Sequence, residues 1–276
     1  MLGAIIGDIV GSTREWHNVK TENFELLPQG SRFTDDTVMT LAVAKWLMDD
    51  PSHKVDSLVR IMQEMGRRYP NAGYGGMFRK WLKSENPQPY GSYGNGSAMR
   101  VSPCAWVMDC GFCARTGMWP SNGRAVARLS AEVTHNHPEG IKGAMATADA
   151  IFMNRFNFGG YYIDYGKPIN DDPEECKRRV KEHIEKEYGY DLSCTLEEIR
   201  PDYKFNETCQ DTVPQAIIAF LESTDFEDAI RNAISLGGDS DTLTCIACSM
   251  GEAYYGIPES IYTRIPHFLN GQYELM

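Results

Sequence analysis

Residues 2–12 read LGAIIGDIVGS and place Gly3, Gly7 and Gly11 at intervals of four. Positions four apart lie on one face of an α-helix, so this stretch predicts a helix with a smooth stripe. Where no side chain projects, a second backbone can approach closely. The stretch therefore indicates a fold of tightly packed helices.

The rest of the chain continues the helical pattern. Residues 37–48 are apolar almost all round, which predicts a central, buried helix. Strand signals are few, and the best of them is the short run 161–163. Apolar periodicity and start signals predict further helices at residues 124–134, 139–154, 174–188, 226–236 and 241–255. The predicted fold class is all-α.

The 276 residues are enough for one large domain or two small ones. We find no internal repeat and no low-complexity linker. Residues 164–210 are more polar than the rest, and we interpret them as a surface excursion of the same domain, with a separate subdomain as the alternative. We therefore expect one domain over residues 1–276.

The net charge of −11 comes without any cluster of Lys and Arg, which excludes a broad nucleic-acid surface. A small anionic ligand stays compatible with it, because metal ions invert local charge. The N-terminus has no basic lead and Asp8 interrupts its apolar run, so we expect no signal peptide. No stretch approaches the roughly 18 apolar residues of a membrane span. We expect a cytoplasmic protein whose cysteines are thiols.

Two CxxC pairs, Cys110/Cys113 and Cys245/Cys248, could indicate a zinc or redox site. The second pair lies in the apolar stretch that predicts a buried helix. Buried cysteine behaves as a small hydrophobic residue. Core packing is therefore the favoured interpretation.

Residues 33–37 read FTDDT and precede the predicted central helix. Adjacent carboxylates flanked by threonines offer the hard oxygen ligands that Mg²⁺ and Mn²⁺ prefer. The alternative is helix capping, because Asp and Thr are favoured at helix starts. This motif alone does not decide between the two.

A second acidic motif, residues 235–242, reads SLGGDSDT and opens another apolar helix. Asp239 and Asp241 could face one ion if Gly237 and Gly238 bend the chain. Helix capping again is the alternative. Together, however, the two motifs would place four carboxylates in the core, where they repel one another unless cations neutralise them. Two metal ions roughly 3.5–4 Å apart would use four such carboxylates.

Residues 91–100 read GSYGNGSAMR, a glycine-rich loop whose backbone N–H groups can face an anion. The loop lacks the Gly-Lys-Ser/Thr of a Walker loop and the strand–loop–helix setting of a dinucleotide site. Tyr93 could stack on a base. A plain glycine turn is the alternative.

A pair of histidines and one glutamate near these motifs allow several interpretations. His135 and His137 form an HxH pair that can bind zinc. Pro138 follows directly, which is typical of a helix start after a loop, and contact with substrate is a third possibility. Glu15 follows the glycine stripe, where a lone glutamate is usually a solvated helix end.

These five stretches, in this order, resemble the ADP-ribosylglycohydrolase family, which includes the dinitrogenase-reductase-activating glycohydrolases and the ADP-ribosyl-acceptor hydrolases. The similarity runs from Met1 to about Gly256 and is weakest over 155–210. The motifs at 34–37 and 237–242 are together similar to the two-metal signature of that family.

The resemblance implies a single compact orthogonal helical bundle with a central cleft for two Mg²⁺ or Mn²⁺ ions. The ligands that it implies for one ion are Thr34, Asp35, Asp36 and Asp241. Those that it implies for the other ion, with Asp241 bridging, are Asp239, Asp241 and Thr242.

The resemblance also implies the substrate contacts. The ADP-ribose loop, which takes the diphosphate on its backbone in the family, corresponds here to Gly91, Ser92, Tyr93, Gly94 and Asn95. Adenine would lie near Tyr93, and His135 is similar to a histidine that lines the ligand. Glu15 matches a glutamate that some members place near the ions and others lack.

The reaction that the resemblance implies is metal-dependent removal of ADP-ribose from an ADP-ribosylated acceptor. Hydrolysis at the anomeric carbon of the distal ribose builds positive charge on the sugar, and Glu15 or Asp36 would take a proton from the attacking water. The alternatives are a metal-dependent phosphoesterase and a non-catalytic ADP-ribose binder. We expect a monomer that acts on a modified protein side chain and releases ADP-ribose. Arginine, serine, a nucleic-acid base and a small molecule all stay open as the acceptor.

Overall fold

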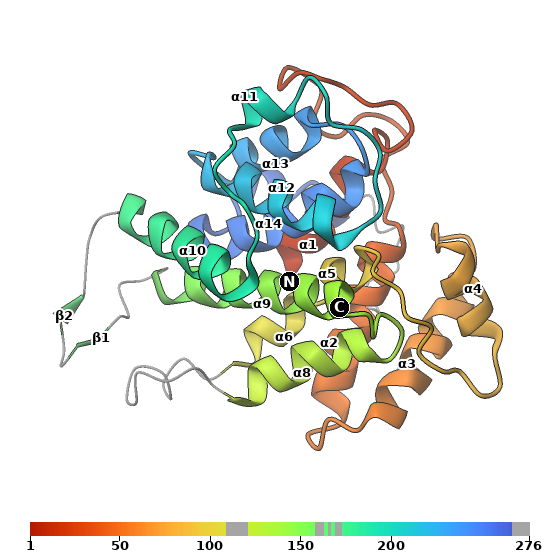
Figure 1. The fold of residues 1–276 in the computed structure, drawn as a ribbon. Coiled ribbons are helices and arrows are strands. Elements are labelled where there is room, and N and C mark those ends of the chain that lie inside the picture. The colour runs from red at the N-terminus through yellow and green to blue at the C-terminus, as the bar shows by residue number, and fades with distance from the viewer. Residues whose placement is uncertain (109–120, 158–162, 165–166, 169–172, 267–276) are drawn as a thin grey trace.

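The computed structural model describes residues 1–276 except 109–120, 158–162, 165–166, 169–172 and 267–276. The chain is mostly helical (Figure 1), which confirms the all-α prediction. Its helices are α1 (Leu2–Gly11), α2 (Asp35–Asp49), α3 (Val55–Arg68), α4 (Gly76–Lys83), α5 (Gly96–Met99), α6 (Ser102–Trp106), α8 (Ser121–Glu132), α9 (Pro138–Asn157), α10 (Pro173–Tyr188), α11 (Leu196–Ile199), α12 (Cys209–Leu221), α13 (Phe226–Ser235), α14 (Ser240–Tyr255) and α15 (Glu259–Tyr262). Two short strands, β1 (Ile163–Asp164) and β2 (Lys167–Pro168), pair antiparallel.

The glycine stripe of α1 lies directly against the backbone of α14. A Cβ built on Gly7 would lie 2.3 Å from the carbonyl oxygen of Thr244, and one on Gly11 would lie 2.5 Å from the Cα of Asp241. Gly3 meets α14 in the same way, one turn earlier. No side chain fits at these positions, so the predicted close approach is confirmed. It fixes the end of α1 beside the start of α14.

Helix α2 is the buried central helix that the sequence predicts, and it begins two residues before the predicted start. Thr34 is its N-cap, and the Thr34 side chain accepts a hydrogen bond from the backbone N–H of Asp36. The capping and the metal interpretations of this motif are therefore compatible. The same residues that start the helix can present carboxylates at its end.

The second CxxC pair lies in the core, as predicted. Cys245 and Cys248 are fully buried on α14, and the Cys245 thiol donates to the carbonyl oxygen of Met99. The pair Cys110/Cys113 lies outside the described residues, as do two residues of the predicted strand run, whose third residue begins β1.

Within the polar segment 164–210, the described residues from 173 onward pack against other helices. Helix α10 lies along α9 (Figure 1) and buries Val180 and Ile184 against it. After α11 the chain returns toward the start of α14, where the ring of Tyr203 packs against Gly238. None of the described helices is both long enough and apolar enough to cross a membrane.

Candidate active site

A cavity of about 770 Å³ opens where the end of α1 and the starts of α2 and α14 meet the loop before α5. Segments that are more than 200 residues apart in the chain contribute to its wall. The residues that the resemblance implies as ligands, catalytic groups or substrate contacts all line it, namely Glu15, Thr34, Asp35, Asp36, Gly91, Ser92, Tyr93, Gly94, Asn95, His135, Asp239, Asp241 and Thr242.

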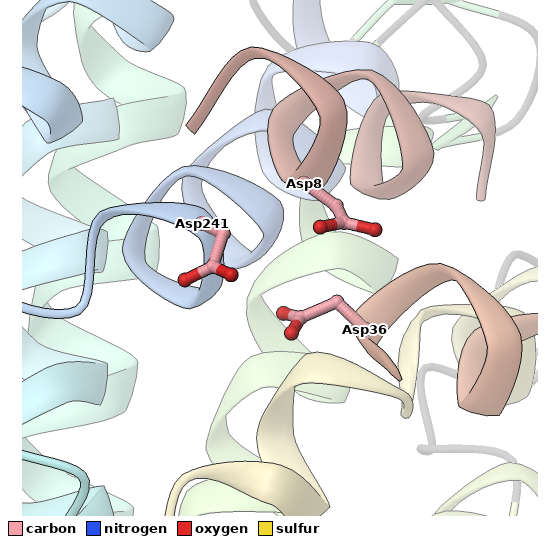
Figure 2. A group of neighbouring side chains, drawn as sticks. All are labelled: Asp8, Asp36 and Asp241. Carbon is pink, nitrogen blue, oxygen red and sulfur yellow. The ribbon is translucent and has the colours of Figure 1, made fainter. Parts of the chain in front are cut away.

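Two groups of carboxylates meet at the inner end of this cavity. Asp8, Asp36 and Asp241 bring oxygen atoms within 4.8 Å of one another and point toward a shared space from α1, α2 and α14 (Figure 2). Glu15, Asp239 and Asp241 form a second group within the same distance. Asp241 belongs to both groups, which agrees with its implied bridging position.

The cluster is a poor environment for unneutralised charge. The Oδ1 atom of Asp36 is buried and accepts no hydrogen bond, and its Oδ2 accepts long ones from Thr34 at 3.4 Å and Thr242 at 3.3 Å. Burial raises the pKa of the Asp36 carboxyl well above its usual range, and the charge of Asp241 raises it further. Burial and Asp241 raise the pKa of Asp239 in the same way.

Divalent cations fit this donor set. It consists of carboxylate and hydroxyl oxygens, the ligands that Mg²⁺ and Mn²⁺ prefer, and it includes a buried oxygen without a partner. Asp35 lies at the edge of the cluster, half-buried, with its Oδ1 close to Gly73. Three of the four carboxylates expected to hold the ions, Asp36, Asp239 and Asp241, thus belong to the two groups, whereas Asp35 belongs to neither.

Asp8 is a residue of the cluster that the sequence analysis did not identify as functional. Its carboxylate accepts hydrogen bonds from the backbone N–H groups of Thr34 at 2.8 Å and Thr37 at 3.0 Å, and from both threonine hydroxyls. Three of these bonds reach Oδ2 and one reaches Oδ1, so Asp8 anchors the start of α2 and keeps an acceptor position on Oδ1 in its group with Asp36 and Asp241. Its signal in the sequence is a single charge inside an otherwise apolar, glycine-striped helix.

The turn before α14 has the bend that the sequence predicts. Gly237 and Gly238 have φ values of +70° and +73°, which favour glycine. The side chain of Asn18 holds this turn: it accepts from the N–H of Gly238 at 2.7 Å and donates to the carbonyl oxygens of Gly238 and Glu15. Asn18 therefore ties the segment that carries Glu15 to the segment that carries Asp239.

Glu15 is half-buried rather than a solvated helix end. Burial raises the pKa of its carboxyl to about 7, with the charge of Asp241 as the second cause. A carboxyl in this position can alternate between its two protonation states near neutral pH.

The loop 91–95 differs from a free anion-binding loop. The N–H of Gly91 donates to Asn136, the N–H of Gly94 donates to Ser92 Oγ, and the N–H of Asn95 donates to the carbonyl oxygen of Glu207. The amides of Ser92 and Tyr93 are the loop donors left for a diphosphate.

Asn95 itself has a different contact from the one expected. Its side-chain amide donates to Asp239 Oδ2 at 2.6 Å and to Thr212 Oγ1 at 3.1 Å. The residue is almost fully buried. Asn95 thus orients a carboxylate of the cluster. It also lines the cavity, and its contact with the ligand stays a prediction.

The two histidines of the HxH pair lie in different surroundings. His135 is buried, with Nδ1 2.7 Å from Thr134 Oγ1, and burial lowers its pKa well below the usual range. His137 is exposed and lies edge-on to Tyr93, with ring centroids 5.3 Å apart. In the part of the chain that the structure describes, neither histidine belongs to a metal-binding group. A neutral His135 and the half-exposed ring of Tyr93 instead border the cavity.

Comparison with known proteins agrees with this geometry. The family model described as ADP-ribosylglycohydrolase matches residues 1–274. The chain is 27% identical to "ADP-ribosylhydrolase ARH3" of Homo sapiens over 94% of its own length and 86% of that protein. It is 23% identical to "ADP-ribosyl-[dinitrogen reductase] glycohydrolase" of Rhodospirillum rubrum, over 94% of its own length and 85% of the relative.

A solved structure shares the fold. The "ADP-ribosylglycohydrolase-related protein complex" superposes with a TM-score of 0.61 at 22% identity, over 95% of this chain and 89% of the other. The family model spans nearly the whole chain, and the motifs that suggested the resemblance converge on one cavity. The chain belongs to the ADP-ribosylglycohydrolase family.

Proposed function

We propose that this protein hydrolyses the bond between an acceptor and the anomeric carbon of the distal ribose, and so releases ADP-ribose. The family places the chain among glycosyl-bond hydrolases. The observation that carries the proposal is the group of Glu15, Asp239 and Asp241, which meets at one end of a cavity lined further out by Tyr93. The volume of this cavity, about 770 Å³, is in the range of pockets that bury small ligands.

Two divalent cations, Mg²⁺ or Mn²⁺, belong to the proposal. Thr34, Asp35, Asp36 and Asp241 would hold one, and Asp239, Asp241 and Thr242 would hold the other. When bound, such ions supply positive charge that neutralises the cluster, orients ribose hydroxyls and makes a bound water more acidic.

Glu15 is the residue that we assign as the base for the attacking water. It is the one carboxylate of its group that is half-buried and faces the open cavity, whereas Asp36 is almost fully buried behind it. Accepting a proton there is general-base catalysis. As the water oxygen bonds to the anomeric carbon, the bond from that carbon to the acceptor breaks, and the acceptor leaves with the bonding electrons and takes up a proton from Glu15 or from solvent.

The remaining walls would hold the rest of the ADP-ribose. The free amides of Ser92 and Tyr93 are suited to diphosphate oxygens, and the Tyr93 ring with His137 offers an aromatic edge for adenine. These contacts lie away from the bond that breaks. Their binding energy would therefore fix the ribose in position rather than act on the reacting atoms.

The test is product analysis with a panel of ADP-ribosylated peptides in Mg²⁺, Mn²⁺ or chelator. The proposal expects intact ADP-ribose, detected by mass spectrometry. AMP and ribose phosphate would indicate a phosphoesterase instead. Binding of ADP-ribose without any turnover would indicate a non-catalytic relative.

A further inference from the structure

Two large aromatic side chains are stacked at the surface beside the cavity. The rings of Trp16 and Phe205 have centroids 5.3 Å apart and an interplanar angle of 23°. Trp16 is 71% exposed and Phe205 39% exposed. Exposed contiguous apolar surface is uncommon in soluble proteins and marks binding sites. We call this pair the aromatic ledge.

The aromatic ledge is continuous with the catalytic end of the cavity. Trp16 directly follows Glu15 and lines the cavity, and Glu207, two residues after Phe205, lines it as well. The ledge thus adjoins the acidic group at Glu15. A substrate seated with its distal ribose at Glu15 would extend its acceptor toward the ledge.

Both sides of the aromatic ledge are held by the same turn. Asn18 ties the segment of Trp16 to Gly238, as described above. On the other side, the ring of Tyr203 packs on Gly238, and the Tyr203 hydroxyl donates to the carbonyl oxygen of Asp211 at 2.8 Å. The two rings are therefore positioned before any ligand arrives, which lowers the entropic cost of binding.

The surroundings of the aromatic ledge select the kind of acceptor. The carboxylates of Glu15 and Glu207 lie near each other beside it, and the chain carries a net charge of −11. Both features disfavour a polyanionic nucleic acid. Trp16 lines the cavity and yet is 71% exposed, so it offers aromatic surface to a ligand larger than the ADP-ribose itself. Rigid aromatic surface of this kind is typical of the anchors that bind polypeptides.

We infer that the aromatic ledge is the acceptor subsite, and that it binds the polypeptide chain on either side of an ADP-ribosylated residue. The inference rests on the proposed function and adds to it the place on this chain where the acceptor polypeptide binds. Phe205 contributes affinity for that polypeptide only, whereas Trp16 also contacts the Glu15 carboxyl through its side chain.

The experiment compares two substrates with the same linkage: an ADP-ribosylated peptide of about ten residues and the corresponding single ADP-ribosylated amino acid with blocked ends. The variants are Trp16→Ala, Phe205→Ala and the double variant. Tyr262→Ala is the matched control, because Tyr262 is also exposed, at 52%, but lies outside the cavity. Trp16→Phe keeps a ring at the ledge and serves as the conservative variant.

We expect the double variant to lose about tenfold in kcat/KM for the peptide, mostly through KM, as for removal of aromatic anchors at an interface. Phe205→Ala is the deciding variant: it should lose about fivefold on the peptide and leave turnover of the amino-acid conjugate within twofold of wild type, whereas Trp16→Ala also removes a contact to Glu15. Trp16→Phe should retain most of the peptide activity, and Tyr262→Ala all of it. Melting curves of each variant report whether the fold is intact.

For Phe205→Ala, equal losses on both substrates, or no loss on either, would overturn the inference and leave the proposed function standing. A wild type that prefers an ADP-ribosylated oligonucleotide over the peptide would also overturn it. A wild type that releases ADP-ribose from none of the conjugates would reject the proposed function and the subsite together.

Discussion

Glu15 is the residue whose position carries most of the proposed chemistry. Its carboxylate belongs to the acidic group with Asp239 and Asp241, and the next residue, Trp16, is largely exposed. Asn18 fixes the backbone of this short segment against the turn before α14. The half-buried Glu15 therefore lies between the buried carboxylates of its group and the exposed Trp16.

Replacing Glu15 with Gln tests this assignment. We expect turnover to fall by about 10² or more, as for loss of a general base. Calorimetric affinity for ADP-ribose should change little, because the other walls of the cavity are untouched. Turnover within threefold of wild type would move the base role to Asp36, the other candidate.

Among the residues of the site, the sequence predicts those that stand in short local motifs. It misses those whose hydrogen-bond partners lie far away along the chain. Asp36 and Asp241 stand in short acidic motifs, so their chemistry is visible in the sequence. Asp8 bonds residues 26 and 29 positions away, and Asn18 bonds Gly238 across 220 positions. No local pattern encodes such pairs, because they exist only once the helices have packed.

At the scale of elements, the packing of α1 on α14 places the site. The stripe of glycines lets the two helix backbones touch, and so brings the residues after Gly11 to within reach of Asp241. The helices that the sequence analysis missed include α3, α4 and α12. In α12, Pro214 interrupts the helical pattern, yet the helix passes through it because its buried packing outweighs one lost hydrogen bond.

Replacing Gly7 with Ala tests the packing of these two helices. Alanine favours a helix by about 1 kcal/mol over glycine. The added Cβ would lie 2.3 Å from the backbone of Thr244, however, and backbone cannot rotate away. We expect a net loss of at least about 2 kcal/mol in the free energy of unfolding, measured by chemical denaturation.

In the matched control Gly76→Ala, the added Cβ meets nothing within 4 Å, so that variant should be as stable as wild type. Equal stability of the two variants would contradict the close approach.

At the scale of the whole molecule, the cavity forms where three chain segments converge that the sequence analysis had treated separately. The periodicity of apolar residues predicts the all-α class, and the residue types predict the acidic motifs. In the folded chain both acidic motifs line the same cavity. The sequence does not predict that the segment before α12 also lines the cavity. Glu207 of this segment is a lining residue, and its carbonyl oxygen accepts a hydrogen bond from the N–H of Asn95. That contact depends on tertiary packing across more than one hundred residues.

Stability of the whole fold should depend on pH and on metal. Burial raises the pKa of Asp36 and Asp239, and raises that of Asp8 to about 7. A carboxyl with a higher pKa when folded binds more protons in the folded state, so stability is full at acidic pH and falls as pH rises through the raised pKa. We expect the melting temperature of metal-free protein to fall from about pH 5 to about pH 8.

Saturating Mn²⁺ should oppose that fall in melting temperature, because a ligand that binds the native state stabilises it. Identical melting curves with and without metal across this range would argue against a shared buried site.

The central claim is that the carboxylates joined by Asp241 hold the metal ions on which release of ADP-ribose depends. The most direct measurement is the rate of ADP-ribose release from a modified peptide by chelated protein, before and after Mn²⁺ or Mg²⁺ is returned, for wild type and Asp241→Asn. Because Asp241 belongs to both acidic groups, its loss should impair both ion positions. We expect chelation to abolish the release of ADP-ribose by the wild type and added metal to restore that release. The Asp241→Asn variant should stay inactive at any metal concentration. Full activity in the chelated wild type, or near-normal release by Asp241→Asn, would contradict it.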